Sequence, residues 1–287
     1  MRRPTPMEVR FFNGGHCRQL LAMADRRTWR IGAFHAVFLA VAHPRHGWVL
    51  IDTGYGTSFA AATRAWPRCL YRWVTPVEAR TPTAEILRAH GIAPEATRHI
   101  VLTHFHADHI GGAKEFPAAT FHHAQEALAP LLALSPLAQT RHAFLPTQLP
   151  EDFAARAAPI PPAGFRAEST TGFPAHDLFG DGSLRLLDLP GHAPGHLGVL
   201  ISSDRGPLLY AADAFWHHRQ IDEDIAPLRL ARIAIHDHRA YTATVARLRV
   251  LQRTTGLRIL ACHCPATQAL VGANTIAAAA GPATLPP

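Results

Sequence analysis

The sequence predicts an α/β protein, in which short apolar strands alternate with helices along 287 residues. In the first half, two apolar runs typical of buried strands, Gly47–Asp52 and His99–Thr103, enclose a helical pattern over Thr83–His90. In the second half, apolar runs flank a segment in which Tyr241 and Leu248 mark one apolar helix face. Because strands and helices are interspersed in both halves, the α/β class applies to the whole chain.

The elements of the first half follow from their boundaries. Gly47–Asp52 (GWVLID) ends in an acidic residue and a turn, and the helix over Thr83–His90 ends at Gly91, a residue type favoured after helices. His99–Thr103 is predicted as a strand, and His104–His109 as the loop that follows it. Further along we expect a helix from Ala113, a strand over Thr120–His122 and a helix over His123–Ala129 that stops at Pro130.

The second half predicts further strands and one long helix. The apolar runs that indicate strands are Leu184–Leu189, Leu197–Ser202, Leu208–Ala212 and Leu257–Ala261. The apolar helix face between the last two consists of Tyr241, Val245, Leu248 and Leu251. The Pro-rich segment of about 130–165 is too apolar for a free linker, so we expect an irregular or helical cap packed over the core. Residues 273–287 are Ala-rich and end in prolines, which predicts a flexible C-terminal tail.

Composition excludes several classes of protein. The formal net charge is +7 and Lys114 is the only lysine, but the arginines are scattered singly or in pairs. A solvated basic surface therefore explains the charge, and no nucleic-acid partner is expected. No apolar run reaches the ~18 residues of a membrane span. The N-terminus lacks the apolar centre of a secretory signal, so a cytoplasmic protein is expected. Four scattered cysteines do not predict a disulfide framework.

The 20 histidines are the informative excess, and three of them gather in one short segment. His104, His106 and His109 stand with Asp108 in the sequence HFHADH. At the extended end of a strand, His104 and His106 project to the same side, because side chains repeat every two residues. Imidazole together with carboxylate is the ligand mixture that suits Zn, Fe or Mn. We therefore interpret this segment as part of a metal site.

Further metal donors are expected at later strand ends. His192 lies in PGHAPGH, Asp213 follows the run Leu208–Ala212, and His263 follows the run Leu257–Ala261. Each has a simpler interpretation when taken singly, since Asp213 could cap the next segment and His263 could end a strand. Together they supply the donors that one loop cannot.

These motifs resemble those of the metallo-β-lactamase-fold hydrolase superfamily. The matching sequences are LIDTG (Leu50–Gly54), HFHADH (His104–His109), GHAPGH (Gly191–His196), Asp213 and His263, and they extend over about residues 37–265. The resemblance implies an αββα sandwich, in which two mixed β-sheets lie face to face with helices outside. It also implies a single domain over residues 1–272 rather than two domains.

The resemblance further implies the metal ligands. A first divalent ion would be held by His104, His106 and His192, and a second by Asp108, His109 and His263, with Asp213 bridging. The expected cofactors are therefore two divalent ions, Zn above all, and a hydroxide between them attacks an electrophilic carbonyl or phosphorus. Asp108 is the expected catalytic residue that holds or receives the nucleophile's proton. Asp52 and His196 are expected to support the ligands by hydrogen bonds.

Within this superfamily the chain resembles the quorum-quenching N-acyl homoserine lactonases. Gly14–Cys17 and the order of the later motifs carry the resemblance, while Trp216 stands where those enzymes have a tyrosine three residues after the bridging aspartate. The implied reaction is hydrolysis of a lactone or ester, and the implied partner is a small molecule, an acylated lactone. A homodimer is an allowed assembly. We expect an apolar acyl pocket lined by the cap and by Trp66, Tyr71 and Trp73.

Other hydrolases of the same fold provide the alternatives. A thioester hydrolase of the glyoxalase II kind shares all the ligands but needs convergent basic residues for glutathione, and Arg247, Arg249 and Arg253 more simply form a solvated helix face. β-Lactam hydrolysis is disfavoured, because Asp213 stands where those lactamases commonly place a cysteine. A phosphodiesterase or nuclease fits the positive charge, but no large insertion for gripping a nucleic-acid strand is present.

Overall fold

The computed structural model describes residues 5–272 of the chain. Its strands are β1 (Val9–Leu20), β2 (Ile31–His43), β3 (Gly47–Ile51), β4 (Val77–Glu78), β5 (His99–Val101), β6 (Thr120–Ala124), β7 (Ala157–Ile160), β8 (Ala175–Asp177), β9 (Leu184–Asp188), β10 (Leu197–Ser203), β11 (Gly206–Tyr210) and β12 (Arg258–Leu260). Its α-helices are α1 (Phe59–Ala62), α2 (Cys69–Val74), α3 (Thr83–Arg88), α4 (Ala107–Ile110), α5 (Ala129–Leu132), α6 (Pro136–Arg141), α7 (Phe153–Arg156), α8 (Arg219–Asp222), α9 (His238–Thr255) and α10 (Pro265–Gln268). Its 3-10 turns are η1 (Leu21–Met23), η2 (Pro94–Ala96), η3 (Ala113–Glu115), η4 (Pro146–Gln148), η5 (Pro162–Gly164) and η6 (Arg229–Ala234).

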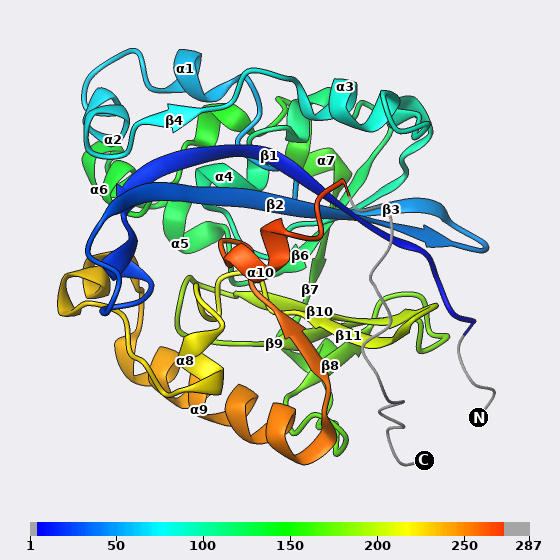
Figure 1. Cartoon of the computed structure of the whole chain (residues 1–287). Helices are drawn as coiled ribbons and strands as arrows, with labels where there is room; N and C mark the ends of the chain where they lie inside the picture. The colour runs from blue at the N-terminus through cyan, green and yellow to red at the C-terminus, as the bar shows by residue number, and fades with distance from the viewer. Residues whose placement is uncertain (1–4, 273–287) are drawn as a thin grey trace.

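Two β-sheets lie face to face, with helices on their outer sides (Figure 1). The first sheet has the strand order β4-β1-β2-β3-β5-β6-β7 and the second the order β12-β11-β10-β9-β8. Both sheets are mixed: β3 is antiparallel to β2 but parallel to β5, and β11 is antiparallel to β10 but parallel to β12. The expected αββα sandwich is confirmed.

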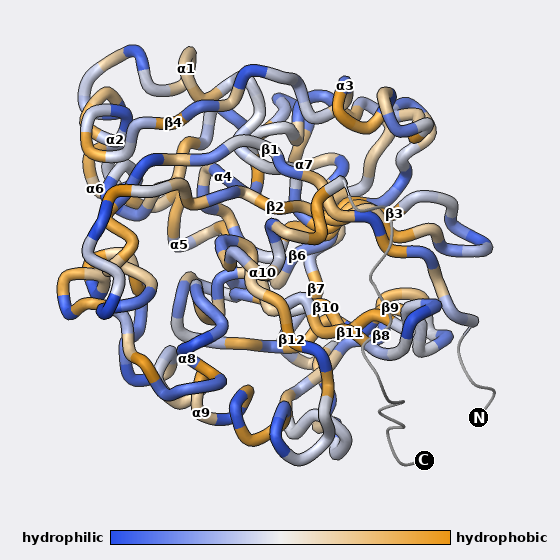
Figure 2. Tube along the Cα trace, in the orientation of Figure 1, coloured by the Kyte–Doolittle hydropathy of each residue, from blue (hydrophilic) through white to orange (hydrophobic). Residues whose placement is uncertain are grey.

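The core lies between the two sheets. Phe38 of β2 and Ile100 of β5 belong to one buried cluster with Leu186 of β9 and Leu208 of β11. Figure 2 shows hydrophobic stretches along β3, β11 and β12. Each such side chain contributes about 1.5–3 kcal/mol by leaving water, so burial between the sheets is what holds them together.

The parallel strand pairs place several strand ends at one edge of the sandwich. The pair β3 and β5 ends beside the pair β11 and β12, and the backbone N–H of Leu197 donates to the carbonyl of Thr103 at 2.9 Å. This last bond joins the start of β10 in the second sheet to the chain that leaves β5 in the first. Residues that follow these strands are thereby brought together from both sheets.

The predicted strands at positions 47, 99, 184, 197, 208 and 257 are all present, as is the long helix α9. This helix begins where the Asp237 carboxylate accepts hydrogen bonds from the backbone N–H groups of Arg239 and Ala240, at 2.9 and 3.0 Å. It ends at Gly256, which has a φ of 67°. Its predicted apolar face, which includes Val245 and Leu248, is buried.

Other expectations were wrong. The segment His104–His109 is not only a loop, because its second half forms the start of α4. The helix expected over His123–Ala129 is absent: His123 and Ala124 continue β6, and α5 begins at Ala129. Pro130 stands in the first turn of α5, where its missing N–H is not needed, rather than stopping a helix. The long strands β1 and β2 were not predicted from the sequence.

The Pro-rich segment of about 130–165 is largely helical, as expected for a cap, and packs onto the core through Leu131, Phe144 and Phe153. Unexpectedly it also contributes β7, which pairs parallel with β6 at the edge of the first sheet. The division into one domain over residues 1–272 and a tail stays a prediction, and the tail at 273–287 lies outside the described residues.

Two predicted absences can be compared with the structure. Within residues 5–272, no helix combines the length and the apolar character that crossing a bilayer requires. The four cysteines are all free thiols, which agrees with the expected lack of a disulfide framework.

Two partly buried histidines form a pair between neighbouring strands β5 and β6. Nδ1 of His99 lies 3.0 Å from Nε2 of His122, so one imidazole must accept the proton that the other donates. Burial lowers the pKa of His122 to about 4, and it also lowers the pKa of His99. In the unfolded chain an imidazole titrates near ~6.5. Between pH 6.5 and 4 the unfolded chain therefore binds more protons at these two imidazoles than the folded chain does.

The variant His122→Phe tests this linkage. The free energy of unfolding of the native protein is expected to fall as the pH is lowered from 6.5 towards 4, and the variant should lose up to ~3 kcal/mol less over that range. Urea unfolding at a series of pH values measures the difference. The matched control is His90→Phe, at an exposed imidazole. Parallel curves for the native protein and His122→Phe would contradict the prediction.

Candidate metal centre

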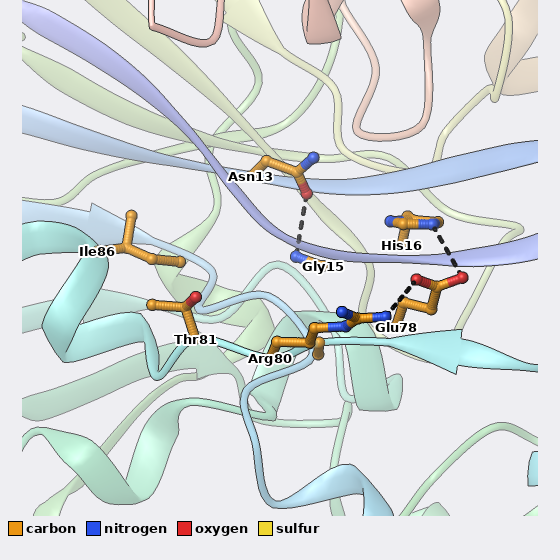
Figure 3. A pocket seen from close by; sticks show the side chains of 8 residues that line it. Asn13, Gly15, His16, Glu78, Arg80, Thr81 and Ile86 are labelled. Atoms are coloured by element: carbon orange, nitrogen blue, oxygen red, sulfur yellow. Dashed lines mark hydrogen bonds and ion pairs between the residues drawn. The ribbon is translucent and has the colours of Figure 1, made fainter.

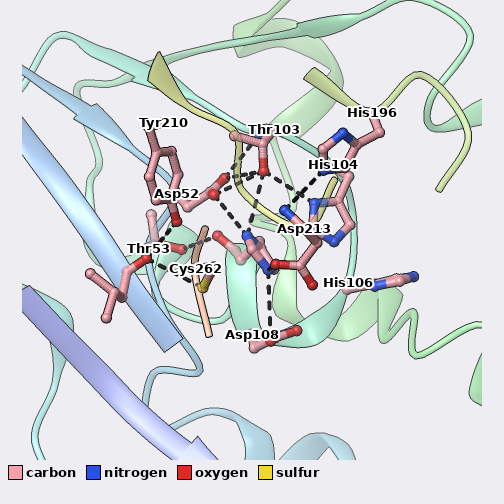
Figure 4. A network of polar contacts seen from close by, with 12 residues as sticks. Asp52, Thr53, Thr103, His104, His106, Asp108, His196, Tyr210, Asp213 and Cys262 are labelled. Atoms are coloured by element: carbon pink, nitrogen blue, oxygen red, sulfur yellow. Dashed lines mark hydrogen bonds and ion pairs between the residues drawn. The ribbon is translucent and has the colours of Figure 1, made fainter. Parts of the chain in front are cut away.

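Polar side chains converge where the strands of both sheets end. His104 and His106 follow β5, and His109 lies on the short helix α4. His192, Asp213 and His263 follow β9, β11 and β12 in the second sheet. The two sheets therefore contribute donors to a single place, and Figure 4 shows the side chains of His104, Asp108 and Asp213 gathered there, with His106 to one side.

The first cluster consists of His104, His106, His192 and Asp213, and their ligand atoms all lie within 4.8 Å of one another. Nε2 of His192 lies 3.1 Å from Nδ1 of His106 and 3.3 Å from Oδ2 of Asp213. His104 and His106 do point to the same side, as the alternation of an extended chain predicts, with ring centroids 4.5 Å apart.

The second cluster consists of His109, Asp213, Cys262 and His263. Nε2 of His263 lies 3.1 Å from Oδ2 of Asp213, and Nε2 of His109 lies 3.6 Å from Oδ1 of the same carboxylate. Asp213 thus belongs to both clusters and presents one of its oxygens to each of two histidines from different sheets. This is the place expected of a bridging ligand.

Asp108 and Cys262 differ from the expected arrangement in opposite ways. Asp108 lies beside the second cluster rather than within it, with Oδ2 at 3.3 Å from Nε2 of His263 and 3.7 Å from Nε2 of His109. Cys262 was not expected at the site. Its thiol donates a hydrogen bond to the backbone carbonyl of Val37 on β2, at 3.4 Å, while its sulfur stays within 4.8 Å of the ligand atoms of the second cluster.

Several donor atoms of the centre are buried without a hydrogen-bond partner in the described residues. They are Nε2 of His104, Nε2 of His109 and Oδ1 of Asp213. A buried polar atom without a partner costs about 1–3 kcal/mol, and two imidazole nitrogens beside a carboxylate oxygen form a donor set for a transition metal. The residues present therefore fit a bound divalent cation.

The pKa values of the first cluster favour neutral imidazoles. Burial holds the pKa of His104 and of His192 well below the ordinary value for histidine, and neighbouring imidazoles add to the effect at His104. Burial also lowers the pKa of His106 to about 4. A neutral imidazole has the free lone pair that coordination requires, so these side chains are ready to bind a metal at neutral pH.

The second cluster has the opposite electrostatic balance. Burial alone would lower the pKa of His109 and of His263, but nearby carboxylates, Asp52 for His109 and Asp213 for both, raise it well above the ordinary value. Burial would likewise raise the pKa of Asp213, yet the histidines around it, His263 first, hold it well below its usual range. This part of the site needs positive charge, either as protons on the imidazoles or as a cation.

Asp52 orients His109, as expected for the carboxylate of LIDTG. Its Oδ2 accepts a hydrogen bond from Nδ1 of His109 at 2.7 Å, and its Oδ1 accepts one from the backbone N–H of Thr103 at 2.8 Å. Asp52 itself has a φ of 62°, a conformation that aspartate tolerates better than most residues. The next turn packs Gly54 against Gly14, and a Cβ on either would lie only 2.5 Å from the other's Cα.

His196 supports the shared carboxylate, also as expected. Its Nδ1 donates to the carbonyl of Leu189 at 3.1 Å, so its Nε2 is free to accept the backbone N–H of Asp213 at 3.2 Å. His263 is oriented in a similar way, since its Nδ1 donates to the carbonyl of His35 on β2 at 2.9 Å. Each of these bonds fixes which nitrogen faces the centre.

Trp216 is part of the same environment. Its indole N–H donates to Oδ2 of Asp213 at 3.3 Å, and its ring stands edge-on to His192, with centroids 5.6 Å apart. Trp216 stands where the resemblance leads one to expect a tyrosine, and its contact with Asp213 was not predicted from the sequence. The indole is aimed at the carboxylate that both clusters share.

The aromatic residues expected to line an acyl pocket divide into two groups. Tyr71 packs inward, edge-on to Phe59 at 5.2 Å between centroids, and Phe59 contacts Tyr55 in the same way. Trp66 and Trp73 are 71% and 70% exposed, so their rings face solvent. The expectation was wrong for these two residues.

An open pocket of about 300 Å³ lies apart from the metal centre (Figure 3). Its lining includes Asn13, His16, Arg80 and Ile86 and contains none of the candidate ligands. Both basic side chains that could attract an anion there, His16 and Arg80, already lie against Glu78 at 3.9 and 3.5 Å. The pocket does not extend the site.

Comparison with known sequences identifies related proteins. The profile of the metallo-beta-lactamase superfamily matches residues 32–257. The N-acyl homoserine lactonase AttM of Azorhizobium caulinodans is 28% identical over 237 residues, which cover 79% of this chain and 81% of that protein. The probable metallo-hydrolase Rv2300c of Mycobacterium tuberculosis is 32% identical over 183 residues, 61% of this chain and 56% of that protein.

Solved structures share the fold. The structure of an N-acyl homoserine lactone hydrolase with the product N-hexanoyl-L-homoserine bound at its catalytic metal centre matches with a TM-score of 0.70 at 16% identity, over 93% of this chain and 96% of that one. AidC, a dizinc quorum-quenching lactonase, matches with a TM-score of 0.65 at 18% identity, over 92% of this chain and 90% of that one. With a family profile that covers most of its length, the chain belongs to the metallo-β-lactamase superfamily and is a metallohydrolase of that superfamily.

Proposed function

We propose that this protein is a dinuclear metal-dependent hydrolase that opens a lactone or ester, with an N-acylated homoserine lactone as the substrate class. The observation that carries the proposal is the Asp213 carboxylate, which belongs to two donor clusters at once. The names of the relatives support the substrate class, because the AttM proteins are lactonases. The match with a dizinc lactonase supports two zinc ions.

The ligands of the two ions follow from the two clusters. His104, His106 and His192 would hold the first ion, and His109 and His263 with Asp108 the second, while Asp213 would bridge. The donors are imidazole nitrogens and carboxylate oxygens, a set suited to zinc. When bound, two such ions supply a water of lowered pKa and polarise the carbonyl of the substrate.

The chain's own residues orient the reactants and accept the proton that the attacking water releases. Asp108 is 7% exposed and lies beside His263 and His109, where its carboxylate can hold the proton that the attacking water gives up. His106 and His263 are the partly exposed members of the donor set, so the substrate approaches from their side. His104, His192 and Asp213 lie deeper and exclude bulk water.

The contacts of the α9 arginines favour a lactone or ester over a glutathione thioester. Arg247 donates to the carbonyl of Gly172 and covers the ring of Phe173, and Arg249 pairs with Asp224. Both guanidinium groups are occupied by neighbours and do not converge on the metal centre. The second half therefore offers no built site for the carboxylates of glutathione among these residues.

A panel of substrates tests the proposed function. The zinc-loaded protein is expected to hydrolyse short- and long-chain N-acyl homoserine lactones, simple lactones and aryl esters faster than a glutathione thioester, a phosphodiester, a β-lactam or a γ-lactam. Hydrolysis rates at equal substrate concentration measure the preference. If lactones and esters are untouched while two ions are bound, the proposed function is wrong.

Replacing Asp108 by Asn tests its role as proton acceptor. The amide keeps the size of the side chain but cannot accept a proton, so kcat is expected to fall by a factor of ~10²–10⁴ with only a modest loss of metal. Steady-state kinetics with metal analysis on the same samples separates the two effects. Asp204→Asn, at an exposed turn, is the matched control and should retain full activity. Undiminished turnover in Asp108→Asn would exclude the role.

Metal content tests the two-ion site directly. The purified protein is expected to carry two divalent ions per chain, and Asp213→Ser at most one, because the shared ligand is lost. Chelation should lower the Tm by about 10 °C, the size expected when a tightly held ligand stabilises only the folded state. Adding zinc back should restore the Tm. Fewer than one ion per chain, with no change of Tm on chelation, would contradict the site itself.

A further inference from the structure

One edge of the molecule combines exposed apolar side chains with arginines. We call it the Arg–Trp edge and define it by three segments, residues 26–31, 64–74 and 229–233. Its exposed large apolar side chains are Trp29, Ile31, Trp66, Trp73, Val74, Leu230 and Ile233. They are most of the large apolar side chains that the described part of the chain exposes, and none of them lies in the core.

The three segments are neighbours in space. Ile31 at the start of β2 pairs with Leu20 of β1, and next to it the side chain of Gln19 donates to the carbonyl of Val74 at 3.1 Å. On the other side of the hairpin, the backbone N–H of Leu228, just before η6, donates to the carbonyl of Ala22 at 3.0 Å. In Figure 1 the β1–β2 hairpin, α2 and the 3-10 turn near residue 230 lie along the left side, and Figure 2 shows apolar and polar residues alternating there.

The edge carries unbalanced positive charge. Its exposed arginines without a carboxylate within 4.0 Å, among the residues that the structure describes, are Arg26, Arg30, Arg64, Arg72, Arg229 and Arg232. The carboxylates beside the hairpin are already paired, since Asp25 is buried against Arg219 and Glu223 contacts Arg27. The segment from Thr53 to Val77 contains no acidic residue.

The proposed reaction does not account for this edge. On α2, Tyr71 packs inward against Phe59, while Trp73 is exposed on the same short helix. Tryptophan side chains that are about 70% exposed contribute little to folding, and large exposed apolar groups that cluster indicate a binding surface. The partner must accept both apolar side chains and guanidinium groups.

We propose that the Arg–Trp edge docks the protein on an anionic lipid surface. Tryptophan prefers the boundary between headgroups and acyl chains, where its ring is apolar and its N–H meets water. Aliphatic side chains such as Ile31 and Ile233 enter the same boundary, and arginines between them pair with lipid phosphates. The interleaving of the two residue types along all three segments is the arrangement that such a boundary requires.

Other partners fit this surface less well. A symmetric contact between two copies would place arginines of one edge against arginines of the other, which repel. Nucleic acid would match the charge, and the exposed tryptophans are suited to base stacking, but protein surfaces that bind it are more polar, and Val74, Leu230 and Ile233 would find no partner there. An anionic membrane satisfies the charge and the apolar side chains together.

Vesicle binding by the full-length, metal-loaded protein tests the proposal. Flotation with phosphatidylcholine vesicles that contain about one third phosphatidylglycerol should recover at least about ten times more protein than flotation with pure phosphatidylcholine vesicles, and added salt should reduce the recovery. The double variant Trp66→Gln/Trp73→Gln should lose most of the binding. Arg64→Gln/Arg72→Gln should weaken it by about five-fold for each arginine, the factor set by attraction of one arginine to an anionic leaflet.

Matched controls lie at the far end of α9. Val250→Gln and Arg253→Gln remove an exposed apolar group and an exposed arginine away from the edge and should bind vesicles like the native protein. Unchanged Tm and lactone turnover in solution show that the edge variants are folded and keep the metal centre. The proposal is overturned if neither vesicle binds or both bind equally. It is also overturned if the edge variants only convert a dimer into a monomer, or lose DNA binding but not vesicle binding.

Discussion

The buried carboxylate of Asp52 is the constraint on which the metal centre depends. It is 1% exposed and accepts hydrogen bonds from the amide and hydroxyl of Thr103 and from Nδ1 of His109. A buried charge costs several kcal/mol unless all its partners are in place, so the end of β3, the end of β5 and α4 must adopt one relative position. That position turns Nε2 of His109 towards Asp213, which follows β11 of the other sheet.

The two sheets meet at the centre in a way that couples folding to metal binding. Asp213 is fixed by His196 in the second sheet, while its oxygens face imidazoles that follow strands of both sheets. The donor geometry exists only when the sandwich is closed, so an ion that binds there stabilises the packing of one sheet on the other. In this closed state the first cluster has neutral imidazoles. The second cluster has an excess of negative charge.

The sequence was most informative where residue chemistry and strand ends coincide. The HFHADH segment and the later donors at His192, Asp213 and His263 could be located because each follows an apolar run that is short and clearly bounded. The strands β1 and β2 could not, because β1 is interrupted by Asn13, two glycines and a bulge, and β2 is buried on both faces and so lacks alternation. Trp66 and Trp73 have the composition of pocket residues, and only tertiary packing shows that they face outward. No sequence pattern indicated that Cys262 lies in the second cluster of the metal centre.

The carbonyl oxygens of β2 limit where residues can be inserted in this chain. Those of His35 and Val37 accept hydrogen bonds from His263, Tyr210 and Cys262 of the second sheet. A strand that slips by one residue turns each carbonyl to the opposite side, so a single-residue insertion within β2 would detach His263 from its support. The hairpin between β1 and β2 is free of this restriction. Over evolution its length and sequence can change, and with them the surface it presents, while the register that serves the metal centre stays intact.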